Sequence, residues 1–366
     1  MDSGLDKAQK ELVQSIKNIH SFEGLLPVHE QIRSDIHQFI SGNAQWQTDH
    51  SVISIMELIS EVHDSIWRRV IHLTIRDLQS DGHLIPEGRF VWIALGSGAR
   101  REQMIITDQD HALLYDNTDI KGEFVSQREA DFHTLSKRVV QGLKEAGYPL
   151  CEGNVMASNT RWRGTGEDWR HRLDDYLALP NWDNVRLLLI ATDMRAVYGE
   201  LSIVNDLRQK WIENLSVKPF PLWLAAKHEL MRNVGMTTFH HLKTESDGEF
   251  KGLFDIKNSF YGPLIRSIRL WAIFHKITAP SSLDRLILLR EKGVWSDSFW
   301  QQVYHALLTA FVLRVRVFLD TEGSRTNGMY VDPHQLPQSV LENIYQSLKV
   351  TRKLQRLTAK HFRKPE

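Results

Sequence analysis

FVWIALGSGARREQMIITDQDHALLY, at residues 90–115, joins two short apolar runs through a glycine-serine turn and a pair of aspartates. Phe90–Leu95 is rich in β-forming residues and leads directly into Gly96, which predicts a buried strand followed by a turn. A second strand is predicted at His111–Tyr115. This part of the chain is therefore expected to fold as strand, turn, strand.

The two aspartates, Asp108 and Asp110, are separated by one residue, and residues two apart on a strand point to the same side. Carboxylates this close repel each other, and a bound divalent cation removes the conflict. Such oxygen ligands suit Mg²⁺, which usually also binds substrate phosphates. Two ions can stabilise both the attacking and the leaving oxygen of an in-line phosphoryl displacement. We expect Asp108 and Asp110 to hold two Mg²⁺ ions, with Mn²⁺ as an alternative.

The glycine-serine turn suits the same anionic substrate. Without a bulky side chain at Gly96, backbone N–H groups can approach phosphate oxygens, and the Ser97 hydroxyl adds a donor. The Arg100 guanidinium could bind a phosphate bidentately, although Arg100 and Arg101 cannot both face the same way on a helix. The expected phosphate-binding residues are Gly96, Ser97 and Arg100.

Helical periodicity dominates the chain on either side of this segment. The N-terminal part is expected to be helical up to about Ser80, on the evidence of an apolar face at Ile55, Ile59, Val62, Ile66, Val70 and Leu73. A further helix is predicted from a capping box at Ser126 and Glu129 to a stop at Gly147, with an apolar face at Phe132, Leu135, Val139, Leu143 and Ala146.

The sequence after Gly147 predicts a third, shorter strand within residues 148–159, followed by a polar loop at 161–171. Helical periodicity then returns near Val185, with one face at Leu187, Leu188, Ala191, Met194 and Val197, and continues to the end of the chain. The prediction is an α+β fold with an N-terminal helical segment (1–80), a small α/β core (81–205) and a C-terminal helical domain (206–366).

Composition limits the function classes. The 45 basic and 45 acidic residues cancel, so no overall field favours nucleic acid or an anionic membrane surface. The basic end at 356–366 is expected to be a solvated helix terminus. The single cysteine, Cys151, excludes an internal disulfide framework, and no apolar run is long enough for a membrane span. We expect a cytoplasmic protein that is not inserted in a membrane.

A glycine-serine pair followed about ten residues later by D-x-D resembles the DNA polymerase β-like nucleotidyltransferase superfamily. The segments LGSGARREQ and TDQDHALLYD are more narrowly similar to the bacterial DUF294 nucleotidyltransferases. These are related to the uridylyltransferases that modify the PII signalling protein. The likeness continues through GYPLCEGNVMASNTRW (147–162), TDMRAVYGE (192–200) and FDIKNSFYGPLIRSIRLWAI (254–273). It departs at Ala99, where a second glycine is common, and we expect none of the regulatory modules that many members carry.

The resemblance implies a mixed sheet of the polymerase β type and a third carboxylate on a later strand, acting as base for the attacking hydroxyl. Glu152 is the nearest candidate, and Asp193 is a more distant one that could equally pair with Arg195. Further substrate contacts are expected among the polar residues Asn154, Asn159, Arg161, Asp255 and Lys257. A hydrogen-bonded loop scaffold explains the first three of these equally well.

Three functional hypotheses remain open. The first is a Mg²⁺-dependent enzyme that transfers a nucleoside monophosphate from an NTP to a hydroxyl of a protein or small-molecule acceptor. The second is a nucleotide-binding regulatory or signalling protein with weak or absent turnover, which an unclear third acid permits. The third is one half of a toxin–antitoxin system with Arg269 and His275 as a ribonuclease pair, although core packing or an ion pair explains those residues better. His240 and His241 lack zinc-site spacing, so we assign no zinc.

Overall fold

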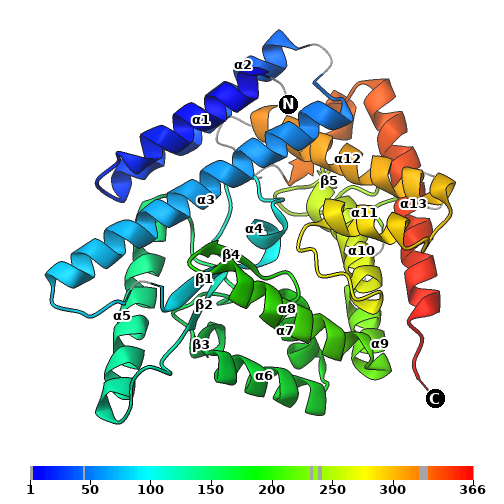
Figure 1. Ribbon diagram of the computed structural model, residues 1–366. Coiled ribbons are helices and arrows are strands. Elements are labelled where there is room, and N and C mark those ends of the chain that lie inside the picture. The colour runs from blue at the N-terminus through cyan, green and yellow to red at the C-terminus, as the bar shows by residue number, and fades with distance from the viewer. Residues whose placement is uncertain are drawn as a thin grey trace. The chain divides into compact units, whose positions relative to one another are not determined.

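The structure is a computed structural model, and it describes residues 3–43, 46–86, 88–230, 234–237, 241–320 and 329–365 (Figure 1). The chain forms two compact units. The first contains Met1–Asp175 and Asp193–Arg208, and the second contains Tyr176–Thr192 and Gln209–Glu366. The division at residues 80 and 205 that the sequence suggests stays a prediction.

The first unit combines long helices with a small sheet. Its elements in chain order are α1 (Ser3–Lys17), η1 (Glu23–Leu25), α2 (Leu26–Gly42), α3 (Asp49–Ser80), β1 (Phe90–Ala94), α4 (Gly96–Arg100), β2 (His111–Tyr115), α5 (Glu123–Glu145), η2 (Thr160–Trp162), β3 (Arg163–Thr165), most of α6 (Gly166–Ala178), β4 (Arg195–Tyr198) and the start of α8 (Leu201–Ser216). The long helix α3 packs against α1 and α5. Its predicted apolar face is buried throughout.

The sheet of the first unit is mixed and has the strand order β3-β2-β1-β4. β1 runs antiparallel to both β2 and β4, whereas β2 runs parallel to β3. All residues of β1 and β2 are buried, which explains why both read as continuous apolar runs rather than as alternating ones. The predicted α+β class with a small mixed sheet is confirmed.

The helix after β2 begins earlier than its predicted capping box. α5 starts at Glu123, directly after Gly122, which has a φ of +64° and ends the preceding loop. Ser126 and Glu129 therefore lie inside the first turns of the helix and do not cap it. Glycine can adopt this left-handed conformation at little cost, so the helix starts where the loop geometry allows.

Two strands lie where the sequence predicted other structure. Within residues 148–159 only an isolated bridge forms, and the third strand is β3, inside the segment predicted to be a loop. The helix predicted across Met194 and Val197 ends earlier, because α7 stops at Ala191 and β4 pairs with β1 instead. A short apolar run that is buried on both sides has no periodicity that separates strand from helix.

The second unit is mainly helical, as predicted. Its elements are the end of α6, α7 (Trp182–Ala191), the end of α8, α9 (Pro219–Glu229), β5 (Phe254–Asp255), the π-helical turn η3 (Lys257–Tyr261), α10 (Gly262–Phe274), α11 (Ser282–Glu291), α12 (Asp297–Asp320), β6 (Tyr330–Val331), η4 (Pro333–Gln335) and α13 (Gln338–His361). β5 and β6 form a two-stranded antiparallel sheet. α10 and α12 both pack against α13.

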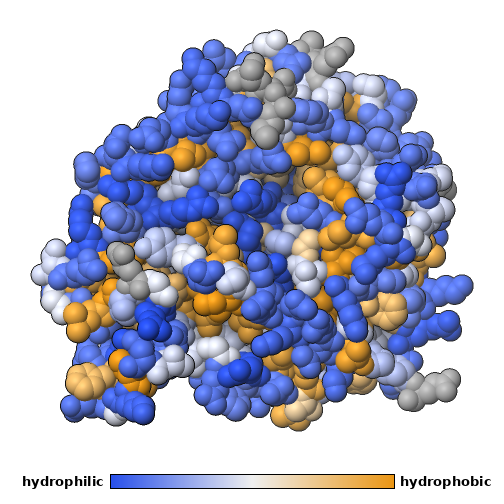
Figure 2. Space-filling view, in the orientation of Figure 1, coloured by the Kyte–Doolittle hydropathy of each residue, from blue (hydrophilic) through white to orange (hydrophobic). Residues whose placement is uncertain are grey.

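Among the described residues one segment, Asp297–Leu319 of α12, is long and apolar enough by composition to cross a membrane. Of its most apolar window, 56% is buried inside the protein, so we interpret α12 as a core helix. The face drawn in Figure 2 is mostly hydrophilic, with apolar residues in scattered groups.

Two histidines are fully buried in the first unit and are neutral. His63 Nδ1 lies 2.6 Å from the Tyr148 hydroxyl and its Nε2 lies 3.1 Å from the Met104 carbonyl. His111 accepts from the Ala157 amide at Nδ1. Both sets of contacts suit a neutral ring. Burial lowers the pKa of each histidine to about 3, because a charged ring would lose its hydration.

We predict that the protein loses stability as the pH falls below about 6.5. In the unfolded chain these two histidines take up protons near pH 6.5, whereas in the folded protein they stay neutral down to about pH 3. The unfolded state thus binds more protons across this window, and each histidine contributes a slope of up to about 1.4 kcal/mol per pH unit. Urea unfolding at pH 7.5, 6.5 and 5.5 measures the slope.

The variant His63→Gln should have a shallower pH slope than the natural protein, even if it is less stable at pH 7.5. The matched control is His50→Gln, which removes an exposed histidine on the same helix and should leave the slope unchanged. Equal slopes for all three proteins would contradict the assignment.

Candidate functional site

The two backbone segments of the candidate site lie side by side at one end of the sheet. β1 and β2 pair up to Ala94 and His111. The pairing continues by one residue, because the Leu95 N–H donates to the Asp110 carbonyl at 2.9 Å. Gly96 follows directly and begins the short helix α4. The glycine-serine turn and the aspartate pair therefore meet.

Gly96 is required by the carboxylate that lies against it. A Cβ atom at this position would lie 2.5 Å from Asp110 Oδ2, too close for two such atoms. The φ of Gly96 is +53°, in the left-handed region that side chains disfavour. Any other residue at position 96 would strain the turn and displace the Asp110 carboxylate.

Gln109 fixes the direction of the two aspartates. It is fully buried, and its Nε2 donates to the Tyr148 carbonyl at 3.0 Å. Because extended backbone alternates its side chains, the inward Gln109 turns Asp108 and Asp110 to the opposite side together. β2 begins at His111, so the pair lies just before the strand rather than within it, and burial alternates there, with Gln109 buried between the more exposed Asp108 and Asp110.

A third side chain, that of Cys151, reaches the aspartate pair. Two backbone hydrogen bonds and an isolated parallel bridge hold residues 149–155 beside residues 109–111. As a result, Cys151 Sγ and one carboxylate oxygen from each of Asp108 and Asp110 lie within 4.8 Å of one another. Asp108 is exposed, and the other two side chains are half-buried. The cluster has two acids and one thiol.

The Cys151 thiol adds no negative charge. Burial, the charge of Asp110 and a hydrogen bond to it raise the pKa of Cys151 to about 12. Mg²⁺ prefers carboxylate oxygen to sulfur, so the donor set fits this cation through Asp108 and Asp110. Glu152, the expected third acid, is exposed and outside the cluster.

Ser97 and Arg100, both expected to bind phosphate, differ in their surroundings. The Ser97 hydroxyl is half-buried and has no hydrogen-bond partner among the described residues. Arg100 is buried, and its guanidinium donates to Glu102 at 2.9 Å and to Asp193 at 2.7 Å. Arg101 is the exposed member of the arginine pair. The Arg100 guanidinium is thus held inside the unit, and a phosphate contact would have to compete with these two carboxylates.

An ion pair between Arg195 and Asp64 holds α4 in place. The Arg195 guanidinium donates to the carbonyls of Gly98 (2.8 Å) and Ala99 (3.1 Å). It also pairs with both Asp64 oxygens, at 2.7 and 2.8 Å. Both side chains are largely buried, with 14% and 5% exposure. The guanidinium adds hydrogen bonds to carbonyls in the last turn of this short helix, and the pair connects α3, α4 and β4.

No pattern in the sequence indicates this pair. The sequence predicts Asp193 as a partner of Arg195 or of a metal, whereas in the structure Asp193 contacts Arg100. No sequence spacing connects Asp64 with Arg195, because 131 residues separate them. Ala99, the position at which the resemblance predicts a glycine, lies in α4 with a negative φ, so its Cβ is tolerated there.

The three polar residues after the cluster form a hydrogen-bonded loop. Asn154 has a φ of +52°, and its carbonyl accepts from the Asn159 side chain at 3.1 Å. Asn159 in turn accepts from the Arg161 amide at 3.0 Å. These contacts support the loop-scaffold interpretation. The exposed side chains of Asn154 and Arg161 stay predicted substrate contacts.

In the second unit, Asp255 is buried and accepts from the Asn258 amide and side chain, both at 2.8 Å. It stabilises the start of η3, while Lys257 is exposed. Arg269 pairs with Glu229 at 2.6 Å, whereas the sequence predicted core packing or a surface ion pair, without a named partner, in preference to a ribonuclease role.

The sequence has two adjacent histidines, His240 and His241, in the second unit. His241 is exposed, and His240 lies outside the described residues.

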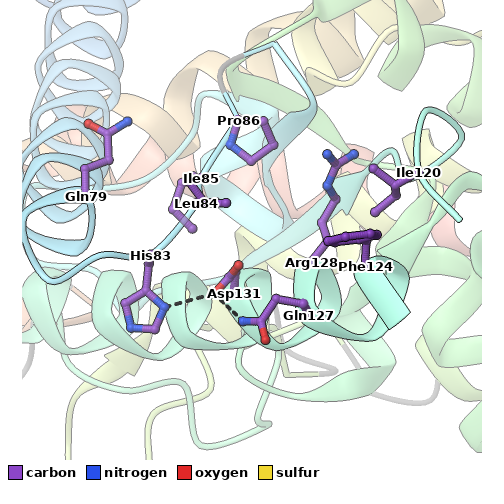
Figure 3. Close-up of a pocket in the computed structure, with 10 residues that line it drawn as sticks. All are labelled: Gln79, His83, Leu84, Ile85, Pro86, Ile120, Phe124, Gln127, Arg128 and Asp131. Carbon is purple, nitrogen blue, oxygen red and sulfur yellow. Dashed lines mark hydrogen bonds and ion pairs between the residues drawn. The ribbon is translucent and has the colours of Figure 1, made fainter. Parts of the chain in front are cut away.

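A separate pocket of about 400 Å³ lies between the segment after α3 and the start of α5 (Figure 3). Its apolar lining comes from Leu84, Ile85, Pro86, Ile120 and Phe124. Its polar groups contact each other, since His83 (2.9 Å) and the Gln127 side chain (3.2 Å) both reach Asp131. None of its lining residues belongs to the Asp108–Asp110 cluster, so we assign it no part in the candidate site.

Two family models match the chain. The model described as "Putative nucleotidyltransferase DUF294" matches residues 38–183. The model described as "Putative nucleotidyltransferase substrate binding domain" matches residues 220–362. Together they cover well over half of the chain. No curated protein matches it.

We predict that Gly96→Ala weakens Mn²⁺ binding at least tenfold. The added methyl group would push the Asp110 carboxylate out of the cluster. The left-handed φ would also lower the free energy of unfolding by about 1 kcal/mol. Titration with Mn²⁺, followed by electron paramagnetic resonance of the free ion, measures the affinity.

The matched control for this variant is Gly82→Ala. Gly82 has a φ of +87°, and no atom lies within 4 Å of the place that its methyl group would take, so this variant carries the backbone strain alone. The control should lose similar stability and keep its Mn²⁺ affinity. If it loses affinity as Gly96→Ala does, the contact with Asp110 is not the cause.

We predict that Cys151→Asp binds Mn²⁺ at least tenfold more tightly than Cys151→Ser. The aspartate would complete a set of three carboxylates, and affinity for hard cations rises with ligand charge. In EDTA the aspartate variant should melt at a lower temperature than the serine variant, because three close carboxylates repel one another. Equal affinities would show that position 151 does not face the cation.

Proposed function

Because the chain belongs to the DUF294 family of nucleotidyltransferases, we propose that it transfers a nucleoside monophosphate from an NTP to a hydroxyl group. The acceptor oxygen bonds to the α-phosphorus, the bond between the α-phosphorus and its bridging oxygen breaks, and pyrophosphate leaves with that oxygen. The acceptor is a protein or a small molecule. The observation that carries this proposal is the contact between Gly96 and Asp110, which joins a phosphate-binding turn to a cation-binding acid pair.

The acid pair has the role of holding the cations. Asp108 and Asp110 face the same side, and their mutual repulsion favours a divalent ion between them. Bound Mg²⁺ would neutralise phosphate charge and stabilise the leaving oxygen. The buried Gln109 keeps the carboxylates in this orientation before any ligand arrives, so little ordering is needed on binding.

The turn has the role of holding the phosphates. Gly96 has no side chain to keep a phosphate from the backbone amides of the turn, and the half-buried Ser97 hydroxyl adds a donor. The Arg195–Asp64 pair fixes the carbonyl side of α4, which leaves the amide side of the turn toward a ligand. The part that matches the substrate-binding model, residues 220–362, selects the acceptor in this proposal.

Cys151 favours a second candidate function. It occupies the third position of the cluster without a carboxylate, so no third acid stands ready there to remove the proton of the acceptor hydroxyl. A protein with this site could bind Mg²⁺ and nucleotide and report on them without efficient transfer. The second candidate is therefore a nucleotide-binding regulatory protein.

A transfer assay separates the two candidates. The full-length protein is incubated with each α-³²P-labelled NTP, with Mg²⁺ or Mn²⁺, and with fractionated protein and metabolite pools. The enzyme proposal expects label on an acceptor and stoichiometric pyrophosphate. Asp108→Asn or Asp110→Asn should lower the transfer at least a hundredfold, because each removes a cation ligand.

The matched control is Asp81→Asn, an exposed acid at the end of α3, which should keep full transfer. Metal-dependent nucleotide binding without transfer to any acceptor would favour the regulatory protein. If no nucleotide binds in the presence of either cation, both candidates are wrong.

A further inference from the structure

The second half of α13 carries a row of cations that line a cavity of about 440 Å³ in the second unit. The lining residues are Met236, Lys349, Arg352, Lys353, Arg356, Leu357 and Lys360. We refer to this cavity as the α13 groove. It shares no residue with the candidate site of the first unit.

Helical spacing gathers these cations on one face. Lys349, Lys353, Arg356 and Lys360 follow one another at intervals of three or four residues, which places them on adjacent turns. The opposite face of α13 is buried, with Leu348, Thr351, Leu354 and Thr358 inside the unit. The row runs from Lys349 to Lys360, so its ends lie about 16 Å apart along the helix.

The groove cations have no acidic partner in the part of the chain that the structure describes. No residue from 343 to 365 is acidic, and none of the five groove cations forms an ion pair with any carboxylate that the structure describes. Two of them contact neutral groups: Arg352 donates to the Met236 carbonyl, and Lys353 lies over the Phe299 ring at 4.6 Å.

Other arginines of the same unit do have carboxylate partners. Arg269 pairs with Glu229, and Arg290 pairs with Asp297. Like charges three or four residues apart destabilise a helix, and among the described residues no carboxylate offsets the repulsion between the groove cations. A bound anion would offset it.

We propose that the α13 groove binds a ligand that carries several phosphate groups. The row is longer than one phosphate needs, and its two arginines can bind phosphate oxygens bidentately while its three lysines supply point charges. The cavity volume falls in the range of small-molecule sites. Either an inorganic polyphosphate or a nucleoside polyphosphate has this chemistry. A single-stranded nucleic acid fits less well, because no described lining residue is an aromatic ring on which a base could stack.

The groove lies inside residues 220–362, which match the substrate-binding model. The proposal does not depend on the transfer reaction, since it concerns binding alone. It also replaces the interpretation of the basic end as only a solvated helix terminus.

The test uses calorimetric titration of the full-length protein that carries Asp108→Asn and Asp110→Asn, in EDTA, so that the first-unit site binds no metal and contributes no metal-dependent signal. The probes are tripolyphosphate, ATP, and citrate as a phosphate-free anion. Tripolyphosphate or ATP should bind at least tenfold more tightly than citrate. Whichever of these two probes binds more tightly shows whether the ligand is an inorganic polyphosphate or a nucleoside polyphosphate.

Arg356→Gln with Lys360→Gln, added to this background, should weaken that binding at least tenfold. Neither side chain has a described polar partner, so the variant should fold and melt at the same or a higher temperature. The matched control is Lys210→Gln with Lys292→Gln, which removes two exposed lysines of the same unit outside the groove. It should keep the affinity.

Three outcomes would overturn the proposal. The first is no tighter binding of tripolyphosphate or ATP than of citrate. The second is equal weakening in the groove variant and its control, which would show only a general effect of charge. The third is tighter binding of a twelve-nucleotide RNA than of both phosphate probes, lost in the groove variant, which would make the groove a nucleic-acid site. The titrated protein lacks the carboxylates of Asp108 and Asp110, so a negative result for the α13 groove would not contradict the proposed transferase activity.

Discussion

The carboxylate of Asp110 lies so close to Gly96 that position 96 has no space for a side chain. This one contact joins two features of different chemistry, a turn with open amide groups and an acid pair suited to a divalent cation. Backbone pairing brings the segments together, because Leu95 bonds to Asp110 at the end of the β1–β2 ladder. The position of each feature is therefore set by the other, and a ligand that needs both finds them already arranged.

Local patterns were sufficient to predict much of this arrangement. The strands β1 and β2, the buried face of α3 and the helical character of the second unit follow from apolar spacing within short windows. The common direction of Asp108 and Asp110 follows from the alternation of extended backbone. The family resemblance added the fold type, and the family models agree with it.

Features that depend on distant partners could not be predicted. Cys151 enters the cluster because residues 149–155 run beside residues 109–111, and neither segment indicates the other. The apolar spacing around β4 predicts helix, because the strand character of β4 comes from pairing with β1 and not from its own spacing. Arg100 was expected to bind phosphate because its position near the turn is visible in the sequence, whereas its contacts with Glu102 and Asp193 are not.

The Arg195–Asp64 pair has a consequence for the smallest piece of chain that can fold with a complete site. The first family model ends at residue 183, twelve residues before Arg195, whose guanidinium holds α4. Arg195 lies on β4, which returns to the first unit after residues 176–192 have formed part of the second unit. A truncation at that boundary would remove an edge strand and leave Asp64 buried without its bidentate partner. A single truncation therefore cannot isolate the first unit. The insert Tyr176–Thr192 belongs to the second unit and would have to be replaced by a linker.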